Sequence, residues 1–478
     1  MVGLIILALV VVFLAVLVIR AATFQPKAQP AVSEEKVDVD LDTAISNLQQ
    51  LVRCKTVSYN DHSLEDKAEF RKLKDLLPKL YPNVFAACEY QEFPGEAILF
   101  RWPGKAAGDP AVMMAHYDVV PVDDEYLWEK PAFEGILEDG YLWGRGTLDT
   151  KITMASALYA ANQLIAEGFV PEQDVYFAFS GGEEVNGPGA VQIVDYFEEK
   201  GITPAMVVDE GGGVVRDVFP GVKEDCAMIG IAEKGMLNVR YSVVSGGGHA
   251  SAPPVKTPVL SLSNACRNVL ANPFRMRISM PVAAMFDTLS RHSSFVYKLI
   301  FSNLWCFKPV LDLICRSSGG EMNALVRTTT AFTMMEGSPA RNVLPAEAHM
   351  VSNMRLNPGD TPESALAYLK KVVKDDSVNV IEMESCHPSR ISTTDCDGWQ
   401  KVASAVASTW RGSIVTPYLM VQCSDSRHYG RICDKVYRFS AMDLTKEDRA
   451  TIHGNNERIR LDVIGRAAEF YLRLLKSC

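Results

Sequence analysis

The sequence predicts an α/β protein with a mostly parallel sheet, helices on both faces, and an inserted α+β domain of ferredoxin-like order. Between residues 111 and 213, short apolar runs alternate with longer runs of helical period, as in parallel sheets with crossover helices. Between residues 236 and 384, the expected order is strand-helix-strand-strand-helix-strand. Polar residues follow the apolar runs of the first region. They would therefore lie at the carboxyl ends of the strands, where α/β sheets bind their ligands.

Length and composition are those of an ordinary globular protein. The 478 residues are 48% hydrophobic and 22% charged, which is enough for two or three domains with cores. The formal net charge of -10 argues against a nucleic-acid partner, which requires a basic surface. Eleven cysteines include no CxxC pair, so we expect buried structural thiols and no thiolate zinc ribbon.

The first 21 residues form a separate segment. Residues 2–19 are uninterrupted, apolar and free of charge, and Arg20 ends the run. This length suits either a cleaved signal peptide or an uncleaved single-pass anchor that associates with the membrane through residues 2–19. Both alternatives send the chain to the secretory pathway, either secreted or anchored with a lumenal or extracellular catalytic domain. Residues 22–40 are polar, contain two prolines and are expected to be a linker.

The main domain is expected to comprise residues 41–233 and 386–478. Periodic apolar positions predict helices at 41–52, 66–80, 151–167, 189–200, 399–410 and 458–476. Short apolar runs predict strands at 111–115, 174–179, 205–208 and 436–439.

The inserted domain is expected to span residues 234–385, as a lid or dimerisation unit. Alternating or apolar runs predict strands at 236–244, 328–335, 346–356 and 378–384, and helical periods predict helices at 258–270 and 362–373. An extra segment at 272–320 contains an apolar stretch, 295–315. We expect this stretch to pack within the domain, and contact with an acyl chain or a membrane is the alternative.

Acidic residues and histidines follow the predicted strands or precede the predicted helices. Each is unremarkable alone, since a helix cap, an acidic turn or a surface histidine would explain it. Together they are His116, Asp118, Asp149, Glu183, Glu184, Asp209, Glu210 and His453. Imidazole and carboxylate ligands without thiolate suit zinc, manganese or cobalt. Two histidines and several carboxylates exceed the needs of one tetrahedral zinc, and they fit two metals about 3.5–4 Å apart.

These residues lie in motifs that resemble the di-zinc aminoacylase and carboxypeptidase S family of metallopeptidases. The shared strings are AHYDVVPV, LWGRGTLDTK, GGEEVNGPGA, VVDEGG, GGHASAPP, ARNVLPAEA, SDSRHY and IHGNNERI, and they cover the chain from about residue 40 to its end. Within the family, the chain looks similar to carboxypeptidase S and to the secreted N-fatty-acyl-amino-acid synthase/hydrolase.

The resemblance implies roles for named residues. Metal ligands would be His116, Asp149 and Glu210 for one zinc, and Asp149, Glu184 and His453 for the other, with Asp149 bridging. Asp209 is the alternative ligand to Glu210. Catalytic roles would fall to Glu183 as general base on the zinc-bridging water, to Asp118, which orients His116, and to His249, which would polarise the scissile carbonyl, often in a neighbouring subunit's site. Substrate-binding residues would be Arg341, Asn342 and Arg427.

The implied activity is cleavage, or reversible formation, of the amide bond of an N-acyl amino acid, with an N-fatty-acyl amino acid favoured. An exopeptidase on short peptides of the carboxypeptidase S type is the first alternative. The family pattern has other residues where this chain has Gly181-Gly182 and Thr150, which leaves an inactive acyl-amino-acid binding protein as an alternative of another class. A small-molecule substrate, two Zn²⁺ per chain (with Co²⁺ or Mn²⁺ as substitutes) and a homodimer are expected.

Overall fold

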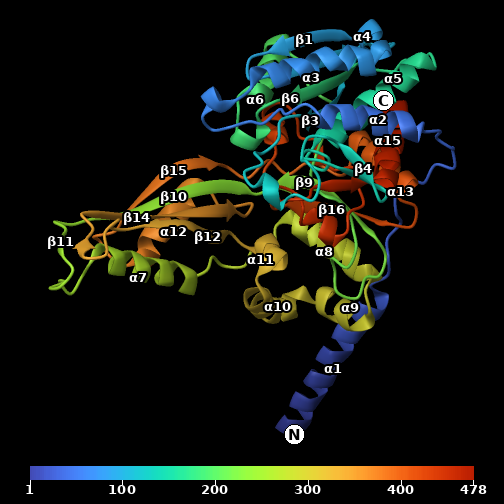
Figure 1. Ribbon diagram of the computed structural model, residues 1–478. Helices are drawn as coiled ribbons and strands as arrows, with labels where there is room; N and C mark the ends of the chain where they lie inside the picture. Colours follow the sequence, from blue (N-terminus) through green and yellow to red (C-terminus); the bar gives the residue numbers. More distant parts are fainter.

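A computed structural model describes residues 1–478, and its centre is a nine-stranded, mostly parallel sheet (Figure 1). The strand order is β1 (Glu89–Phe93), β2 (Ala97–Trp102), β6 (Val175–Ser180), β3 (Ala111–His116), β7 (Met206–Asp209), β17 (Val436–Arg438), β9 (Cys226–Glu233) and β16 (Ile414–Met420), with β8 (Gly213–Val215) paired to β9. The pairs β6–β3, β3–β7, β7–β17 and β9–β16 are parallel. The fully apolar burial of β3 and β6 explains their unbroken hydrophobic runs.

Helices cover both faces of this sheet. One face carries α2 (Leu41–Val52), α3 (Lys67–Leu80), α4 (Pro82–Ala87), α5 (Lys151–Ala166), α13 (Asp397–Thr409) and α15 (Leu461–Lys476), and the other carries α6 (Gly189–Lys200) and the 3₁₀ segment η4 (Asp425–Arg431). A small sheet of β4 (Ile136–Glu138), β5 (Tyr141–Trp143) and β18 (Arg458–Arg460) lies beside α15, and the short helix α14 (Lys446–Arg449) precedes it.

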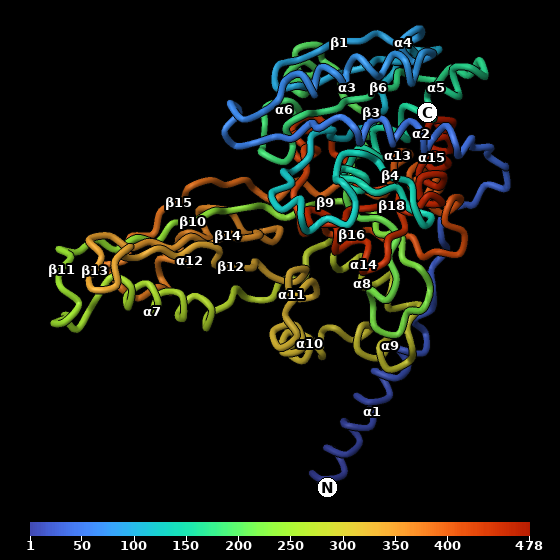
Figure 2. Tube along the Cα trace, viewed as in Figure 1, coloured from blue at the N-terminus to red at the C-terminus, as the bar shows by residue number.

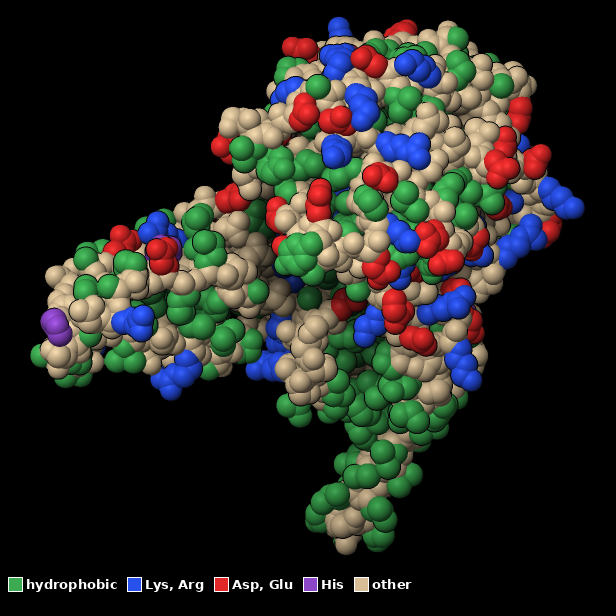
Figure 3. All heavy atoms as spheres, in the orientation of Figure 1, with side chains coloured by type: hydrophobic (Ala, Val, Ile, Leu, Met, Phe, Trp, Pro, Cys, Tyr) green, Lys and Arg blue, Asp and Glu red, His purple; other side chains and the backbone are tan.

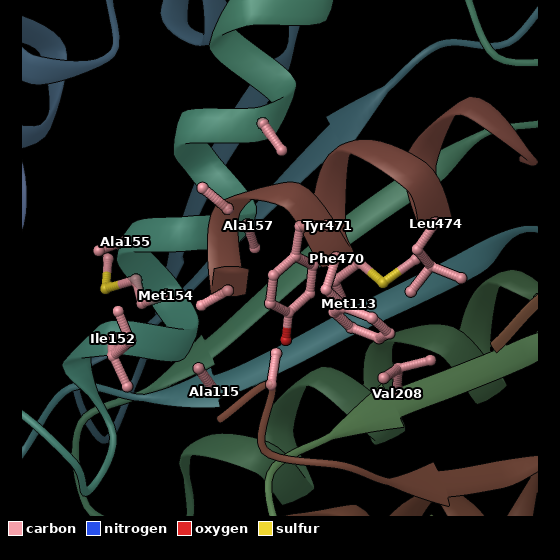
Figure 4. Packing of buried hydrophobic residues seen from close by; sticks show 14 of the residues in the cluster. Met113, Ala115, Ile152, Met154, Ala155, Ala157, Val208, Phe470, Tyr471 and Leu474 are labelled. Atoms are coloured by element: carbon pink, nitrogen blue, oxygen red, sulfur yellow. The ribbon is translucent and has the colours of Figure 1, made fainter. Parts of the chain in front are cut away.

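The main core lies between β3 and the helices α5 and α15 (Figure 4). Met113 of β3, Ala157 of α5 and Phe470 of α15 are all fully buried in it. Helix α5 is rich in alanine, and these small side chains allow α15 to pack closely against it. This packing fixes the start of α5 against the end of β3, and both of these positions carry polar side chains.

A second sheet projects from the main body with two helices on one side (Figures 1 and 2). It is antiparallel, in the order β12 (Thr329–Glu336), β14 (Glu347–Leu356), β10 (Gly235–Val244) and β15 (Asn379–Cys386), and α7 (Pro258–Ala271) and α12 (Pro362–Val373) cover it. This is the ferredoxin-like strand order. We call this unit the arm. Its tip carries a small antiparallel sheet of β11 (Gly248–His249) and β13 (Val343–Leu344), which are distant in sequence.

Four helices within the same stretch of sequence pack against the main body. They are α8 (Met280–His292), α9 (Phe295–Phe301), α10 (Leu304–Ser318) and α11 (Gly320–Val326). Residues of α8 and α11 share a buried cluster with β9 and β16 of the central sheet, including Phe286, Leu325 and Leu419. The expectation that the apolar stretch 295–315 packs within the inserted domain is therefore wrong, because Phe301, Leu311 and Cys315 share a cluster with the central sheet. The segment forms a helical wall on the end of the large sheet.

The first helix, α1 (Val2–Thr23), leaves the body beside α9 and extends into solvent (Figure 1). It is long and apolar enough to cross a membrane, and little of it is buried. Near its carboxyl end, Arg20 donates a hydrogen bond to the carbonyl of Ser302 at 2.8 Å. All eleven cysteines are free thiols.

Candidate dinuclear metal centre

Polar side chains from five separate elements meet at one edge of the central sheet. His116 ends β3, and Glu183 and Glu184 begin the 3₁₀ turn η3 (Glu183–Val185) after β6. Glu210 directly follows β7. Since β6, β3 and β7 are parallel neighbours, their carboxyl ends must lie side by side. Asp149 precedes α5, and His453 comes from the loop before β18.

Asp149 lies between two histidines. One of its carboxylate oxygens is 3.0 Å from Nε2 of His116, and the other is 3.1 Å from Nε2 of His453. Glu210 is 3.3 Å from the same nitrogen of His116, and Glu184 is 3.2 Å from that of His453. The five predicted ligands thus form two groups that share one carboxylate.

The hydrogen bonding of His116 tests whether this set fits a cation. Its Nδ1 lies 3.0 Å from the backbone carbonyl of Asp118, which only accepts hydrogen bonds, so Nδ1 carries the hydrogen. In the neutral ring, the lone pair of Nε2 then faces the oxygens of Asp149 and Glu210. Acceptors turned toward one another at such distances need a positive charge between them. Imidazole nitrogen and carboxylate oxygen together suit a divalent transition metal, so the residues fit one.

The acidic cluster has an excess of negative charge. Burial raises the pKa of Glu210 to about 8, although the charge of His116 acts to lower it. Burial also raises the pKa of Glu184, and it raises that of Glu183 well above its ordinary range. His116 with Glu183 and Glu210, and His116 with Asp149 and Glu184, each offer ligand atoms within 4.8 Å of one another. Bound cations would relieve this repulsion.

Asp118 fixes the loop that carries the glutamate pair. Its carboxylate accepts the backbone N–H groups of Glu183 and Glu184 at 3.1 and 3.2 Å, and the hydroxyl of Ser58 at 2.7 Å. One oxygen also lies 3.4 Å from Nδ1 of His116. A single buried carboxylate therefore sets the positions of one histidine and of both glutamates, although glycines precede the pair.

Glu457 is a functional position that the sequence reasoning did not identify. It is fully buried, accepts Arg145 at 2.7 Å, and accepts the N–H groups of Gly146 and Leu148 at 3.0 and 2.8 Å. These bonds hold the loop that ends at Asp149. The signal was present, since Glu457 belongs to the same motif as His453, but nothing in the sequence shows which loop it would meet.

Asp425 is a second buried carboxylate that sequence reasoning missed. It accepts the hydroxyl of Ser180 at 2.6 Å, and its charge contributes to the raised pKa of Glu183. Arg427, two residues further on, donates to the side chain of Asn186 at 2.8 Å. Arg427 thus lies beside the end of the η3 turn, close to the centre but outside the two ligand groups.

Three predicted residues lie away from the centre. His249, Arg341 and Asn342 are exposed at the tip of the arm, where the N–H of Ala250 donates to the carbonyl of Asn342 at 2.9 Å. Figures 1 and 2 show β11 at the end of the arm that is remote from β3. In this conformation, the single chain does not bring these side chains to the ligand groups.

A cavity of about 700 Å³ opens beside the ligand groups. Asp149, Glu183, Glu184, Glu210 and His453 form part of its wall, and 17 of its 30 lining residues are hydrophobic. The helical wall and the end of β16 contribute part of the hydrophobic lining, including Met285, Leu289, Met322, Leu325 and Met420. This volume is in the usual range for small-molecule sites, about 300–1,000 Å³.

A carboxylate–imidazole cluster at the carboxyl edge of a mostly parallel sheet, beside a cavity of small-molecule size, is the arrangement expected of a metal-dependent hydrolase. A family model described as "Peptidase family M20/M25/M40" matches residues 112–477. The chain belongs to this family of metallohydrolases, which typically depend on two metal ions.

Several relatives match nearly the whole chain. A probable carboxypeptidase S-like 2 of Dictyostelium discoideum is 31% identical, with 98% of this chain and 92% of the relative covered. An N-fatty-acyl-amino acid synthase/hydrolase of Xenopus tropicalis is 32% identical, over 98% of this chain and 93% of the relative. The solved M20 metallo-carboxypeptidase Sso-CP2 of Sulfolobus solfataricus has the same fold, with a TM-score of 0.66 and 18% identity over 92% of this chain and 99% of that one.

Proposed function

We propose that the protein hydrolyses, and in reverse forms, the amide bond of N-fatty-acyl amino acids. The observation that carries this proposal is the cavity of about 700 Å³, because one wall includes the ligand groups, most of its lining is hydrophobic, and an acyl chain would fit in it beside the reacting amide. The Xenopus tropicalis relative is named for the same class of substrate. A site for short peptides would need polar walls along the cavity.

The metal ligands we propose are His116, Asp149 and Glu210 on one side, and Asp149, Glu184 and His453 on the other. When bound, two divalent cations, which we expect to be zinc, supply a water of lowered pKa and polarise the carbonyl. Asp149 has the position of the shared ligand, because each of its oxygens faces a different histidine.

Glu183 is the proposed proton carrier. Its side chain lines the cavity and makes no ion pair with either histidine, whereas Glu210 pairs with His116 and Glu184 with His453. Burial raises its pKa, which makes the carboxylate a better acceptor for a proton from attacking water, and the proton would then pass to the leaving amine. Asp118 positions it through the backbone N–H. Arg427 at the side of the η3 turn is a proposed contact for the substrate carboxylate.

The test compares release of phenylalanine from oleoyl-phenylalanine with release from an N-blocked dipeptide, each with and without chelator. We expect chelator-sensitive release from oleoyl-phenylalanine, and a loss of about 10²–10⁴-fold in kcat for Glu183→Gln. Preference for the blocked dipeptide would replace the proposal with an exopeptidase of the carboxypeptidase S type. A chain that contains no zinc and releases neither product would be a binding protein.

A further inference from the structure

The outer face of α9 and α10 exposes an unusual number of large hydrophobic side chains. Phe295 and Val296 on α9 are 50% and 64% exposed, and Trp305 and Leu313 on α10 are 62% and 68% exposed. Val310 and Ile314 add to the same group, which we call the α9–α10 face. Single exposed hydrophobic residues are ordinary, whereas six on two consecutive helices indicate a contact surface.

This face continues directly into α1. The ring of Phe13 meets that of Trp305 edge-on, with centroids 5.9 Å apart, and Asn303 donates to the carbonyl of Leu17 at 3.1 Å. Figure 3 shows hydrophobic side chains gathered at the end of the body where α1 leaves it. We propose that the α9–α10 face lies in the headgroup region of a lipid membrane, beside the apolar helix α1.

The position of the contacts along α1 supports this placement. Phe13 and Arg20 are seven residues apart, which is about 10 Å along a helix axis. With Arg20 at the outer edge of a headgroup layer about 5–8 Å thick, Trp305 beside Phe13 lies close to the boundary between headgroups and acyl chains. Tryptophan is enriched at this depth, because its ring is amphipathic. The face itself has the aromatic and aliphatic composition of an interfacial helix.

The charge around the face also fits a membrane. Residues 295–316 contain Lys298, Lys308 and Arg316 but only one acid, Asp312, in a chain of net charge -10. Neither Lys298 nor Lys308 makes an ion pair, and Lys308 is exposed. Unpaired basic residues beside apolar ones attract anionic lipid headgroups, at about 1 kcal/mol for each charge near the surface. A second copy of this chain would bring the same positive charges together.

The α9–α10 face is joined to the cavity by its neighbours in the chain. Helix α8 precedes α9 and contributes Met285 and Leu289 to the cavity, and α11 follows α10 and contributes Met322 and Leu325. An amphiphile that leaves the bilayer at this face would therefore meet the wall of the cavity first. This consequence rests on the proposed function, whereas membrane contact itself does not.

Trp305 provides a reporter for the test. The other five tryptophans are all buried, at 9% exposure or less, so lipid can reach only Trp305. The full chain is placed in nanodiscs of phosphatidylcholine and phosphatidylserine, with or without lipids brominated near the headgroup end of their acyl chains. We expect bromine to quench the emission, and Trp305→Phe to remove most of the quenchable part. Trp399→Phe, in the core, is the matched control and should leave it unchanged.

Equal quenching in wild type and Trp305→Phe, or no quenching in either, would overturn the proposal. If a second copy covered the face, Trp305 would be shielded from aqueous iodide without being quenched by lipid, and the protein would be dimeric in detergent through this face. Leu313→Glu then tests delivery: turnover of bilayer-embedded oleoyl-phenylalanine should fall at least about tenfold, with turnover of soluble acetyl-phenylalanine unchanged. If wild type cleaved neither substrate, the proposed function would fail while the quenching result stood.

Discussion

Asp149 is the residue on which the candidate centre depends, because its two oxygens face His116 and His453 separately. No other side chain contacts both histidines. A carboxylate in this position neutralises charge on both sides of the centre, whereas Glu184 and Glu210 each serve one side. The backbone N–H of Asp149 donates a hydrogen bond to the carboxylate of Glu457 at 3.4 Å.

Asp149→Ala should therefore weaken binding of both metals. Loss of residues that only orient a ligand costs about 10–100-fold in affinity, so loss of a shared ligand should cost at least about 100-fold. Metal content per chain after dialysis, measured by mass spectrometry, checks this. Glu183→Gln is the control, and it should keep its metal while losing activity. Full metal content in Asp149→Ala would remove this residue from the ligand set.

Glu457 should matter for stability as well as for the position of the loop. Glu457→Gln leaves the Arg145 guanidinium buried without its partner, and breaking a buried pair in this way costs about 3–5 kcal/mol. We expect a reduction of that order in the free energy of unfolding, measured with denaturant. Glu447→Gln on the exposed side of α14 is the matched control. A variant as stable as wild type would mean that Arg145 finds another acceptor.

At the scale of elements, the helical wall of α8–α11 is the feature that determines how large a substrate the cavity accepts. The ligand groups on the wall of the cavity lie mainly at the ends of strands. Helices α8 and α11 add apolar side chains to the wall, and sequence patterns identify these helices only as apolar. Change in the wall should therefore alter the preference for acyl chains without altering the chemical step.

Met322→Trp on α11 narrows the cavity without removing a buried core residue. We expect kcat/KM for oleoyl-phenylalanine to fall by about 10–200-fold relative to butyryl-phenylalanine, since a pocket discriminates by about 1–3 kcal/mol for each methylene that it rejects. Met334→Trp, exposed on β12 of the arm, controls for the added ring. Equal loss on both substrates would show that Met322 does not contact the acyl chain.

The elements themselves were largely predictable from sequence. The expected strands at 111–115, 174–179 and 205–208 correspond to β3, β6 and β7, and the helix expected at 189–200 is α6. Their periodic or unbroken apolar runs carry that information locally. The antiparallel edge formed by β1 and β2, and the insertion of β17 between β7 and β9, depend on contacts between distant segments, which no local pattern specifies.

The candidate ligands were predictable for a related reason. His116, Glu183 and Glu210 follow predicted strands, and the rule for parallel sheets places such residues together. Asp425 and Glu457 act through contacts with residues more than 200 positions away, so only the folded chain identifies them. The position of His249 at the tip of the arm likewise depends on the angle of the arm, which the sequence does not encode in any local motif.

On the scale of the whole molecule, the arm separates His249 from the ligand groups of its own chain. A role for His249 in the reaction therefore requires either closure of the arm or a second chain. The resemblance to a family whose lid histidine often reaches a neighbouring subunit favours a homodimer, in which each arm would serve the other chain's centre.

Mixing two inactive variants distinguishes these arrangements. His249→Ala and Glu183→Gln should each lose most of their activity, measured on oleoyl-phenylalanine. In a dimer that exchanges arms, a mixed pair has one complete centre, so equal mixing after subunit exchange should restore about a quarter of the wild-type activity. Closure within one chain predicts no recovery on mixing, because neither chain then holds both residues.

Few connecting segments join the arm to the body. Two of them are the connection that enters β10 after Glu233 and the connection that leaves β15 after Cys386. A rigid sheet anchored at its base is a lever: a small rotation at the base sweeps the tip through a much larger arc. A substitution at these connections, far from both His249 and the metal ligands, would change the reach of the tip as effectively as shortening the sheet. For a reaction that uses His249, bending stiffness at the base, a mechanical property, would be a determinant of catalytic rate.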